Sequence, residues 1–221
     1  CGACRSCGYC GDVAHPDLHW YFPRPRLKDS DATPADVKDD FREGRQERVE
    51  AGGLYAPPSG LEGLFVATVR TIVQQASVSP ALARRKVFVV GDAERMAVNE
   101  EKAEAANAFL KLLEEPPEDT TIILTSSESG ALLPTIRSRV VAVRVPPVAE
   151  ADLRAFLADP AVVARLGEST GPALEKRVAE AGGAPGKLVG DDDQAAAERN
   201  ARALLETVKG DRALRYKVAM A

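Results

Sequence analysis

The sequence predicts an α/β protein in which helices flank a parallel sheet, followed by a smaller region that is entirely helical. Two observations lead to this prediction. Short runs rich in β-branched residues alternate with segments of helical periodicity between residues 61 and 145. Strands and helices that alternate in this way form parallel sheets with helical crossovers. Pro146-Pro147 then ends the alternation, and only helical patterns follow.

Three short apolar runs have the composition of buried parallel strands, which are rich in Val, Ile and Leu over their whole length. They span residues 86–91, 121–125 and 140–145. An aromatic-rich run, 15–22, is expected to be extended. The three apolar runs are the predicted strands of the sheet.

Helical spacing of apolar residues predicts an amphipathic helix within 61–76. A second helix is expected to begin at Asn99, a favourable N-cap, and to stop at Pro116-Pro117. A polar turn and a short helix around 132–137 then lead to the last predicted strand. These helices supply the expected crossovers of the parallel sheet.

Residues 23–60 differ in character from their surroundings, because they are charged and bounded by Pro and Gly. Within them, Pro34 to Glu50 is a predicted helix with Thr33 as its N-cap and Asp36 in its first turn. The segment has few apolar residues. We therefore expect a surface helix or a mobile insertion.

The rest of the chain is predicted to be helical, with helices at 150–158, 160–166, 172–181 and 194–208 and another beginning near Asp211. This pattern indicates a small helical domain followed by a longer pair of helices. The predicted domains are 1–147, with a metal-binding module in 1–22 and an insertion in 23–60, then 148–190 and 191–221.

The charge balance argues against a protein that grips nucleic acid along its surface, since 29 basic residues face 33 acidic ones for a net charge of -4. No apolar stretch is long enough for a membrane span, and no signal peptide is recognisable. All four cysteines lie in the first ten residues, which favours a reducing cytoplasm over a disulfide-stabilised secreted fold. The chain begins at Cys1 rather than Met, so we expect it to be incomplete at its N-terminus.

The four cysteines, Cys1, Cys4, Cys7 and Cys10, follow one another with two residues between each pair. Four thiolates suffice for tetrahedral Zn²⁺, so zinc is the expected metal. An iron–sulfur cluster is the alternative, although ferredoxin-type runs place a proline after the last cysteine and here Gly11 follows Cys10. Four ligands at this spacing are crowded around one ion. A ligand upstream of the chain would leave Cys10 outside the site.

The chain contains no phosphate-binding motif of the G-x4-G-K-[ST] type. The nearest approach, 183–188, has the wrong spacing and is expected to be a turn before a helix. After the strand at 86–91, Asp92 occupies the place of a Mg²⁺-binding carboxylate, Ala93 the place of a water-activating glutamate, and Glu94 comes one residue late. We expect a polar loop without catalysis.

Ser138-Arg139 follows the short helix at 132–137. An arginine at such an edge can reach the γ-phosphate of a nucleotide on a neighbouring subunit. Taken alone, an exposed arginine is more often a solvated charge.

Several motifs together resemble the AAA+ domain of bacterial clamp-loader subunits. These are Ala106–Pro117, which ends in Leu-Glu-Glu-Pro-Pro, then Thr121–Thr125 and Leu133–Arg139. Residues 1–7, with His15-Pro16-Asp17, resemble the zinc module of the same family. The resemblance implies a P-loop-type AAA+ sheet, a helical lid domain after it, and the start of a helical collar from about residue 191.

Asp92-Ala93 makes the chain similar to delta-prime subunits, because the gamma/tau motor subunits carry Asp-Glu at this position. The resemblance implies that Arg139, preceded by Ser138, is an arginine finger for an adjacent subunit, with Val140 where the family usually has cysteine. It also implies zinc held by three clustered cysteines, matched by Cys1, Cys4 and Cys7, and one upstream cysteine. Lys187 falls at the place of a second arginine sensor.

The function expected from this resemblance is that of an accessory subunit within the DNA polymerase III holoenzyme. It would assemble with gamma/tau and delta subunits and help load the sliding clamp onto primed DNA. ATP would be bound only at a partner interface or not at all, without hydrolysis by the chain itself. The alternatives are a gamma/tau-type motor with a P-loop upstream and a stand-alone zinc-ribbon nucleic-acid binder, which the acidic net charge disfavours.

Overall fold

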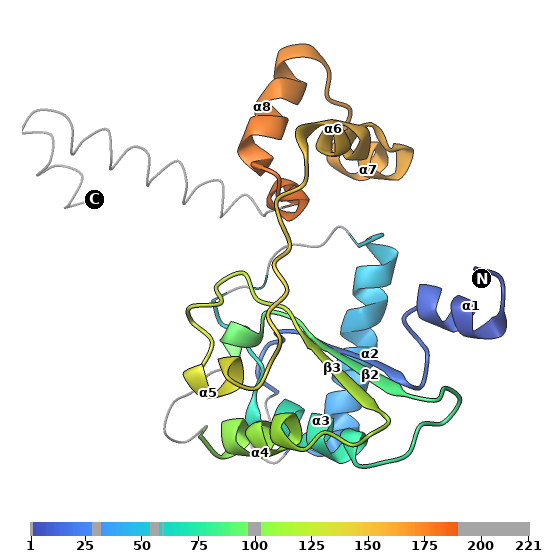
Figure 1. The fold of residues 1–221 in the computed structure, drawn as a ribbon. Helices are drawn as coiled ribbons and strands as arrows, with labels where there is room; N and C mark the ends of the chain where they lie inside the picture. The colour runs from blue at the N-terminus through green and yellow to red at the C-terminus, as the bar shows by residue number, and fades with distance from the viewer. Residues whose placement is uncertain (1, 28–31, 54–57, 59, 97–102, 190–221) are drawn as a thin grey trace, which may run out of the picture. The chain divides into compact units, whose positions relative to one another are not determined.

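The computed structural model describes residues 2–27, 32–53, 58, 60–96 and 103–189 (Figure 1). The chain divides into two compact units. Of the described residues, the first unit contains 2–27, 32–53, 58, 60–96 and 103–145, and the second contains 146–189. Each unit has a hydrophobic core of its own.

The first unit is built on a parallel sheet of three strands in the order β1-β2-β3. The strands are β1 (Leu18–Tyr21), β2 (Lys86–Val90) and β3 (Thr120–Leu124). The predicted strands at 86–91 and 121–125 are therefore confirmed. The aromatic-rich run contributes the third strand, pairing with β2 so that His19 lies opposite Phe88 and their rings stack with centroids 4.6 Å apart.

The predicted strand at 140–145 is wrong for the described part of the chain, where these residues belong to no strand. The side chains of Val141, Val143 and Val145 are 82 to 92% exposed. A β-branched run becomes a strand only when a neighbouring strand supplies its hydrogen bonds and a packing face. Residues 140–145 have a high strand propensity, but among the described residues no neighbouring strand pairs with them.

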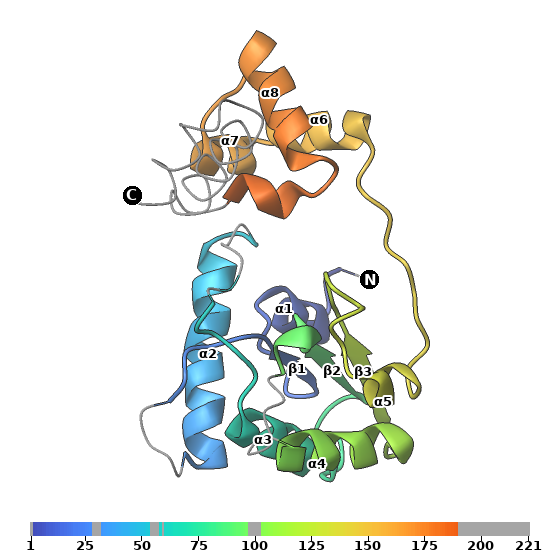
Figure 2. The same cartoon turned by 90° about the vertical axis from the view of Figure 1, so that its left-hand side faces the viewer.

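Two helices, α3 (Val66–Ala76) and α4 (Ala103–Glu114), pack side by side on one face of the sheet (Figure 2). Phe88 and Val90 alternate along β2 onto this face of the sheet. Both are fully buried, because they pack in the same core as Phe109 of α4. The predicted helix in 61–76 starts later than expected, at Val66. The predicted N-cap Asn99 lies outside the described residues.

Helix α2 (Pro34–Glu50) begins as predicted. Thr33 Oγ1 accepts a hydrogen bond from the Asp36 backbone N–H at 3.3 Å, and Asp36 Oδ2 accepts one from the Thr33 N–H at 2.8 Å. This reciprocal capping box satisfies two N–H groups that the first turn otherwise leaves unpaired. The local cap signal was sufficient to locate the start of the helix.

The mobile-insertion alternative is wrong for α2, which is a surface helix with one buried face. Val37 and Phe41 are buried, and the Phe41 ring packs edge-on against Tyr21 and Phe22 with centroids 4.8 and 5.4 Å apart. Together with Gly44, they form a narrow stripe at i, i+4 and i+7, which is the spacing of one helix face. Only three of the 17 residues of α2 form this stripe, so the sequence pattern alone did not reveal the buried face.

The described residues of the first unit also include three short helical segments. They are α1 (Arg5–Gly11) in the cysteine region, the 3₁₀ turn η1 (Ala93–Arg95) after β2, and α5 (Pro134–Arg137). The last of these confirms the short helix predicted around 132–137.

The second unit is helical, with α6 (Glu150–Ala158), α7 (Pro160–Leu166), α8 (Gly171–Ala181) and the 3₁₀ turn η3 (Pro185–Val189). The predicted bounds of the first three helices agree with these to within one residue. The predicted helices at 194–208 and near 211 lie outside the described residues. No helix among the residues described is both long and apolar enough to cross a membrane.

Apolar packing and an ion pair join α6 and α8 within the second unit. Leu153 and Leu157 of α6 pack with Val178 and Ala181 of α8 in a small apolar core. Arg154 of α6 also donates to both carboxylate oxygens of Glu175, at 2.8 and 2.7 Å.

Candidate functional site

Arg139 lies directly after α5 and is held by contacts within its own unit. Its Nε donates to Glu114 Oε1 at 2.8 Å, and its Nη2 donates to the same carboxylate oxygen. Its Nη1 donates to the Thr135 carbonyl oxygen at 2.8 Å and to Ser138 Oγ at 3.1 Å. The structure thus brings together the two predicted residues, Ser138 and Arg139, with a carboxylate from the end of α4.

Local sequence explains why these groups meet. Pro116-Pro117 cannot continue α4, so that helix ends at Glu114. Pro134 occupies the first turn of α5, where its missing N–H does no harm, and Ile136 is buried in the core of the first unit. Burial of Ile136 anchors the short helix, and the anchored helix presents Arg139 at its end. The Arg139 side chain remains 30% exposed.

An open groove of about 1020 Å³ lies beside β3. Ser138 and Arg139 line it, together with apolar residues of β3 such as Ile123 and with Val141 and Val143 of the segment that follows α5. The groove is therefore apolar along the strand and polar where the Ser-Arg pair contributes.

The loop after β2 is polar but engaged in its own structure. Asp92 has a positive φ of 46°, a backbone conformation that Asp tolerates better than most residues, and its N–H donates to Thr125 Oγ1 at 3.3 Å. Burial, and then the nearby Glu94 carboxylate, raise the pKa of Asp92. Ala93 is 1% exposed, so the residue after Asp92 presents no side chain to solvent.

Glu94 connects this loop to the one after β3. Its Oε1 accepts hydrogen bonds from the Ser127 backbone N–H at 3.1 Å and from the Ser127 hydroxyl at 2.9 Å. Burial opposes ionisation, but hydrogen bonds from backbone N–H groups and from the hydroxyls of Ser126 and Ser127 outweigh it, so the pKa of Glu94 is lowered. Glu94 thus acts here as a tether between loops.

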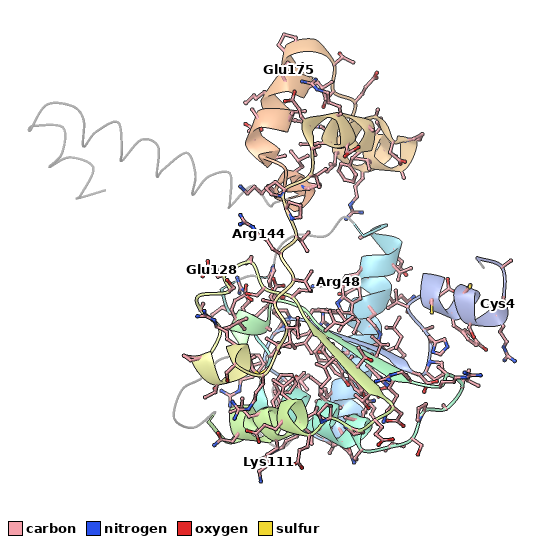
Figure 3. The ribbon with its side chains drawn as sticks, viewed as in Figure 1. Cys4, Arg48, Lys111, Glu128, Arg144 and Glu175 are labelled. Atoms are coloured by element: carbon pink, nitrogen blue, oxygen red, sulfur yellow. The ribbon has the colours of Figure 1, made fainter. Side chains whose placement is uncertain are left out.

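In the cysteine region, Cys4 caps α1 and Cys7 lies in its first turn, with their sulfur atoms 3.5 Å apart (Figure 3). Two thiolates on one tetrahedral zinc ion are about 3.8 Å apart, given Zn–S bonds of about 2.3 Å. The hydrogen bond from Cys4 is the main cause of a lowered pKa of Cys7. This pair has nearly the separation that shared ligands require.

The other two cysteines are placed differently. Cys10 is exposed, and within the described part of the chain no three His, Cys, Asp or Glu side chains gather into a metal-binding group. Cys1 lies outside the described residues. The structure therefore brings Cys4 and Cys7 together without Cys10. Lys187, which the resemblance aligns with a second arginine sensor, is exposed on η3, and its role stays a prediction.

Glu114 is the residue of this site to which the sequence assigned no role. It belongs to the Leu-Glu-Glu-Pro-Pro motif, but its partner Arg139 is 25 residues further along the chain. Two acidic residues at a helix C-terminus are unfavourable in the field of the helix, which prefers cations there. That local conflict was the available signal that one of them has a cationic partner.

Comparisons with a family model and with individual proteins point to the same protein family. The family model described as DNA polymerase III, delta subunit, matches residues 1–149. The chain is 32% identical over 186 residues to DNA polymerase III subunit delta' of Pseudomonas aeruginosa, covering 84% of this chain and 43% of that protein. It is 31% identical over 139 residues to the delta' subunit of Escherichia coli, covering 63% of this chain and 30% of that protein.

The gamma/tau subunit of Mycobacterium tuberculosis is 37% identical over 70 residues, which are 32% of this chain and 11% of that protein. A gamma subunit-related protein from Thermotoga maritima aligns over 92% of this chain and 66% of its own, with 28% identity and a TM-score of 0.38, too low to add to the assignment. The chain spans less than half the length of the curated relatives named here. Because the family match covers the sheet, the cysteine region and the Ser-Arg motif, the chain belongs to the DNA polymerase III clamp-loader subunits of delta-prime type.

Proposed function

We propose that this chain is an accessory clamp-loader subunit that supplies Arg139 in trans to ATP bound by a neighbouring gamma/tau-type subunit. The observation that carries the proposal is the anchored, partly exposed guanidinium at the end of α5, with Ser138 beside it. A guanidinium offers parallel N–H donors that match phosphate oxygens, and in phosphoryl transfer it stabilises charge that develops in the transition state.

Two features support the view that the chain does not hydrolyse ATP itself. Ala93 is buried where a motor subunit has its activating carboxylate, and Glu94 is occupied by Ser127. A gamma/tau-type motor is the alternative, supported by the 70-residue similarity to the Mycobacterium tuberculosis subunit. Hydrolysis of ATP by the isolated full-length subunit would favour that alternative.

Membership of the family supports a wider role in this proposal. The proposed partners are gamma/tau-type and delta subunits, and through the assembled complex the sliding clamp and primed DNA. In this proposal the three-stranded sheet is part of an AAA+ domain and the helical unit after Pro146 is its lid. The cytoplasm stays a predicted location, based on the cysteine pattern.

The decisive experiment compares the ATP hydrolysis rate of the reconstituted complex containing wild-type subunit with that containing Arg139→Ala. The loss expected at this interface is at least about ten-fold, since arginine fingers contribute more than this in well-studied phosphoryl-transfer enzymes. Arg144→Ala is the matched control, because Arg144 is exposed in the adjacent segment. An unchanged rate with Arg139→Ala would contradict the proposal.

We also propose a structural zinc ion in the cysteine region. Cys4 and Cys7 would hold it with Cys1, and the fourth ligand would be Cys10 or a residue outside the chain. The seven-residue helix α1 buries none of its side chains against the described core, so a metal ion would supply cross-links that packing does not. Elemental analysis of the full-length protein should find zinc; iron with visible absorbance would favour the iron–sulfur alternative.

A further inference from the structure

One ion pair joins the two motifs that mark this family in the sequence. Glu114 comes from the Leu-Glu-Glu-Pro-Pro end of α4, and Arg139 comes from the Ser-Arg motif after α5. Glu114 is 46% exposed and Arg139 30% exposed, so both are accessible from solvent. The neighbouring Glu115 is also exposed and is not part of this ion pair.

Most of the N–H donors of Arg139 already form hydrogen bonds within the subunit. A guanidinium has five N–H donors. Nε and one N–H of Nη2 point to Glu114, while Nη1 donates to the Thr135 carbonyl and to Ser138 Oγ. These contacts among described residues use four of the five donors. A bidentate contact with phosphate needs two parallel N–H groups, so Arg139 cannot form it while all four bonds persist.

Glu114 occupies the Nε–Nη2 edge of the Arg139 guanidinium. Nε and Nη2 form one side of the guanidinium fork, and this side can bind two oxygens in parallel. Nη1, on the other side, is bonded to α5 itself through Thr135 and Ser138. Release of Glu114 alone would therefore free a phosphate-binding edge while the arginine stays attached to its helix.

We propose that Glu114 is a latch that holds Arg139 within its own subunit until the phosphate of a partner-bound nucleotide displaces it. This inference rests on the proposed role of Arg139 in trans. A partly exposed ion pair is weak enough to exchange, since such pairs shift an equilibrium by only about 1.4- to 5-fold. A nucleotide phosphate carries more negative charge than one carboxylate and competes for the same donors.

The position of Glu114 agrees with this role. A carboxylate in the last turn of α4 faces the negative end of the helix dipole, which is unfavourable without a nearby cation. Arg139 supplies that cation in the free subunit. When Arg139 moves to a nucleotide, Glu114 loses that cation, but its side chain is 46% exposed, so hydration of its charge limits the loss.

The test is the steady-state ATP hydrolysis rate of the full-length subunit assembled with gamma/tau-type and delta subunits, at subsaturating Mg-ATP and without clamp or DNA. Glu114→Gln and Glu114→Ala should each raise the rate by about two- to five-fold, the range of a surface ion pair. Glu115→Gln, the matched control, should leave it unchanged. The double variant Glu114→Gln/Arg139→Ala should behave as Arg139→Ala alone, because Glu114 acts only through that arginine.

The outcomes separate the latch from the proposed function. If Arg139→Ala leaves the rate unchanged, the trans role itself fails, and the latch with it. If Arg139→Ala lowers the rate while Glu114→Gln leaves it unchanged, the trans role stands and the latch is refuted. A lower rate with Glu114→Gln also refutes the latch, and assigns Glu114 to positioning the arginine. Thermal unfolding of each variant shows that a change in rate does not reflect loss of folded subunit.

Discussion

A buried aspartate fixes the loop that leads into β2. Asp17 is 4% exposed, and its carboxylate accepts hydrogen bonds from three consecutive backbone N–H groups. Oδ1 accepts from Ala81 at 2.6 Å, and Oδ2 accepts from Leu82 at 2.7 Å and from Ala83 at 2.6 Å. The loop is otherwise exposed, so this one side chain supplies much of its attachment to the sheet.

Replacement of Asp17 by Asn should destabilise the first unit strongly. An amide keeps one acceptor oxygen but turns an NH₂ group toward backbone donors that it cannot satisfy. At least one charge-assisted bond is lost and one buried N–H is left unpaired, which together cost about 2–5 kcal/mol. For a protein of this size, that loss corresponds to a fall in Tm of roughly 5–15 °C.

Thermal and urea unfolding of wild type and Asp17→Asn at pH 7 measure this loss. The matched control is Asp39→Asn, the same chemical change at an exposed side chain whose ion pair with Arg42 is 2.7 Å long. An exposed pair of this kind contributes less than about 1 kcal/mol. The reasoning is refuted if Asp17→Asn costs no more than the control.

The effect should also depend on pH in a defined direction. Burial opposes the charge on Asp17, but the three backbone donors outweigh it, so the pKa of the folded protein lies below its usual value. A lowered carboxyl pKa contributes stability above the unfolded-state pKa of about 3.9, and this contribution is lost as pH falls toward the folded-state pKa. The stability advantage over Asp17→Asn should therefore shrink below about pH 4. A difference that stays constant as the pH is lowered would contradict this explanation.

Three further predictions concern α2 and the cysteines. Phe41→Ala should cost about 3–5 kcal/mol in urea unfolding, because the ring is buried; a cost below about 1 kcal/mol would return α2 to the role of a loose insertion. Gly44→Ala should lower the urea midpoint, although Ala usually favours a helix by about 0.5–1 kcal/mol, since a Cβ would lie 2.8 Å from Arg24 Nη1; a higher midpoint would show that Arg24 yields easily. Cys7→Ser should abolish zinc binding by elemental analysis, and Cys10→Ser tests the open fourth position; zinc loss in the second variant would identify Cys10 as a ligand, and retained zinc would place that ligand elsewhere.

Local signals were sufficient for the helices that carry their own caps and stops. Thr33 and Asp36 form the capping box that their sequence spacing predicts, and the prolines at 34 and 160 occupy the first turns of α2 and α7. Such signals act between residues that are close in the chain. The tertiary structure is not needed to read them.

The sheet shows the limit of local signals. The run at 140–145 has a stronger strand composition than Leu18–Tyr21, yet only the latter pairs with β2 in the described structure. A run of residues forms a strand only when a neighbouring strand pairs with it, and that neighbouring strand is distant in sequence. For the same reason the three buried positions of α2 became recognisable only once Tyr21 and Phe22 lay against Phe41.

The sequence by itself determined the fold class, the family resemblance and the residues of interest, Ser138, Arg139 and the cysteines. Tertiary structure decided which of these residues meet. It paired Arg139 with Glu114 across 25 residues and placed Cys4 beside Cys7 without Cys10. Motif spacing identifies the side chains that could form a site. Their hydrogen bonds and ion pairs depend on distances of a few ångströms, which only the packed core sets.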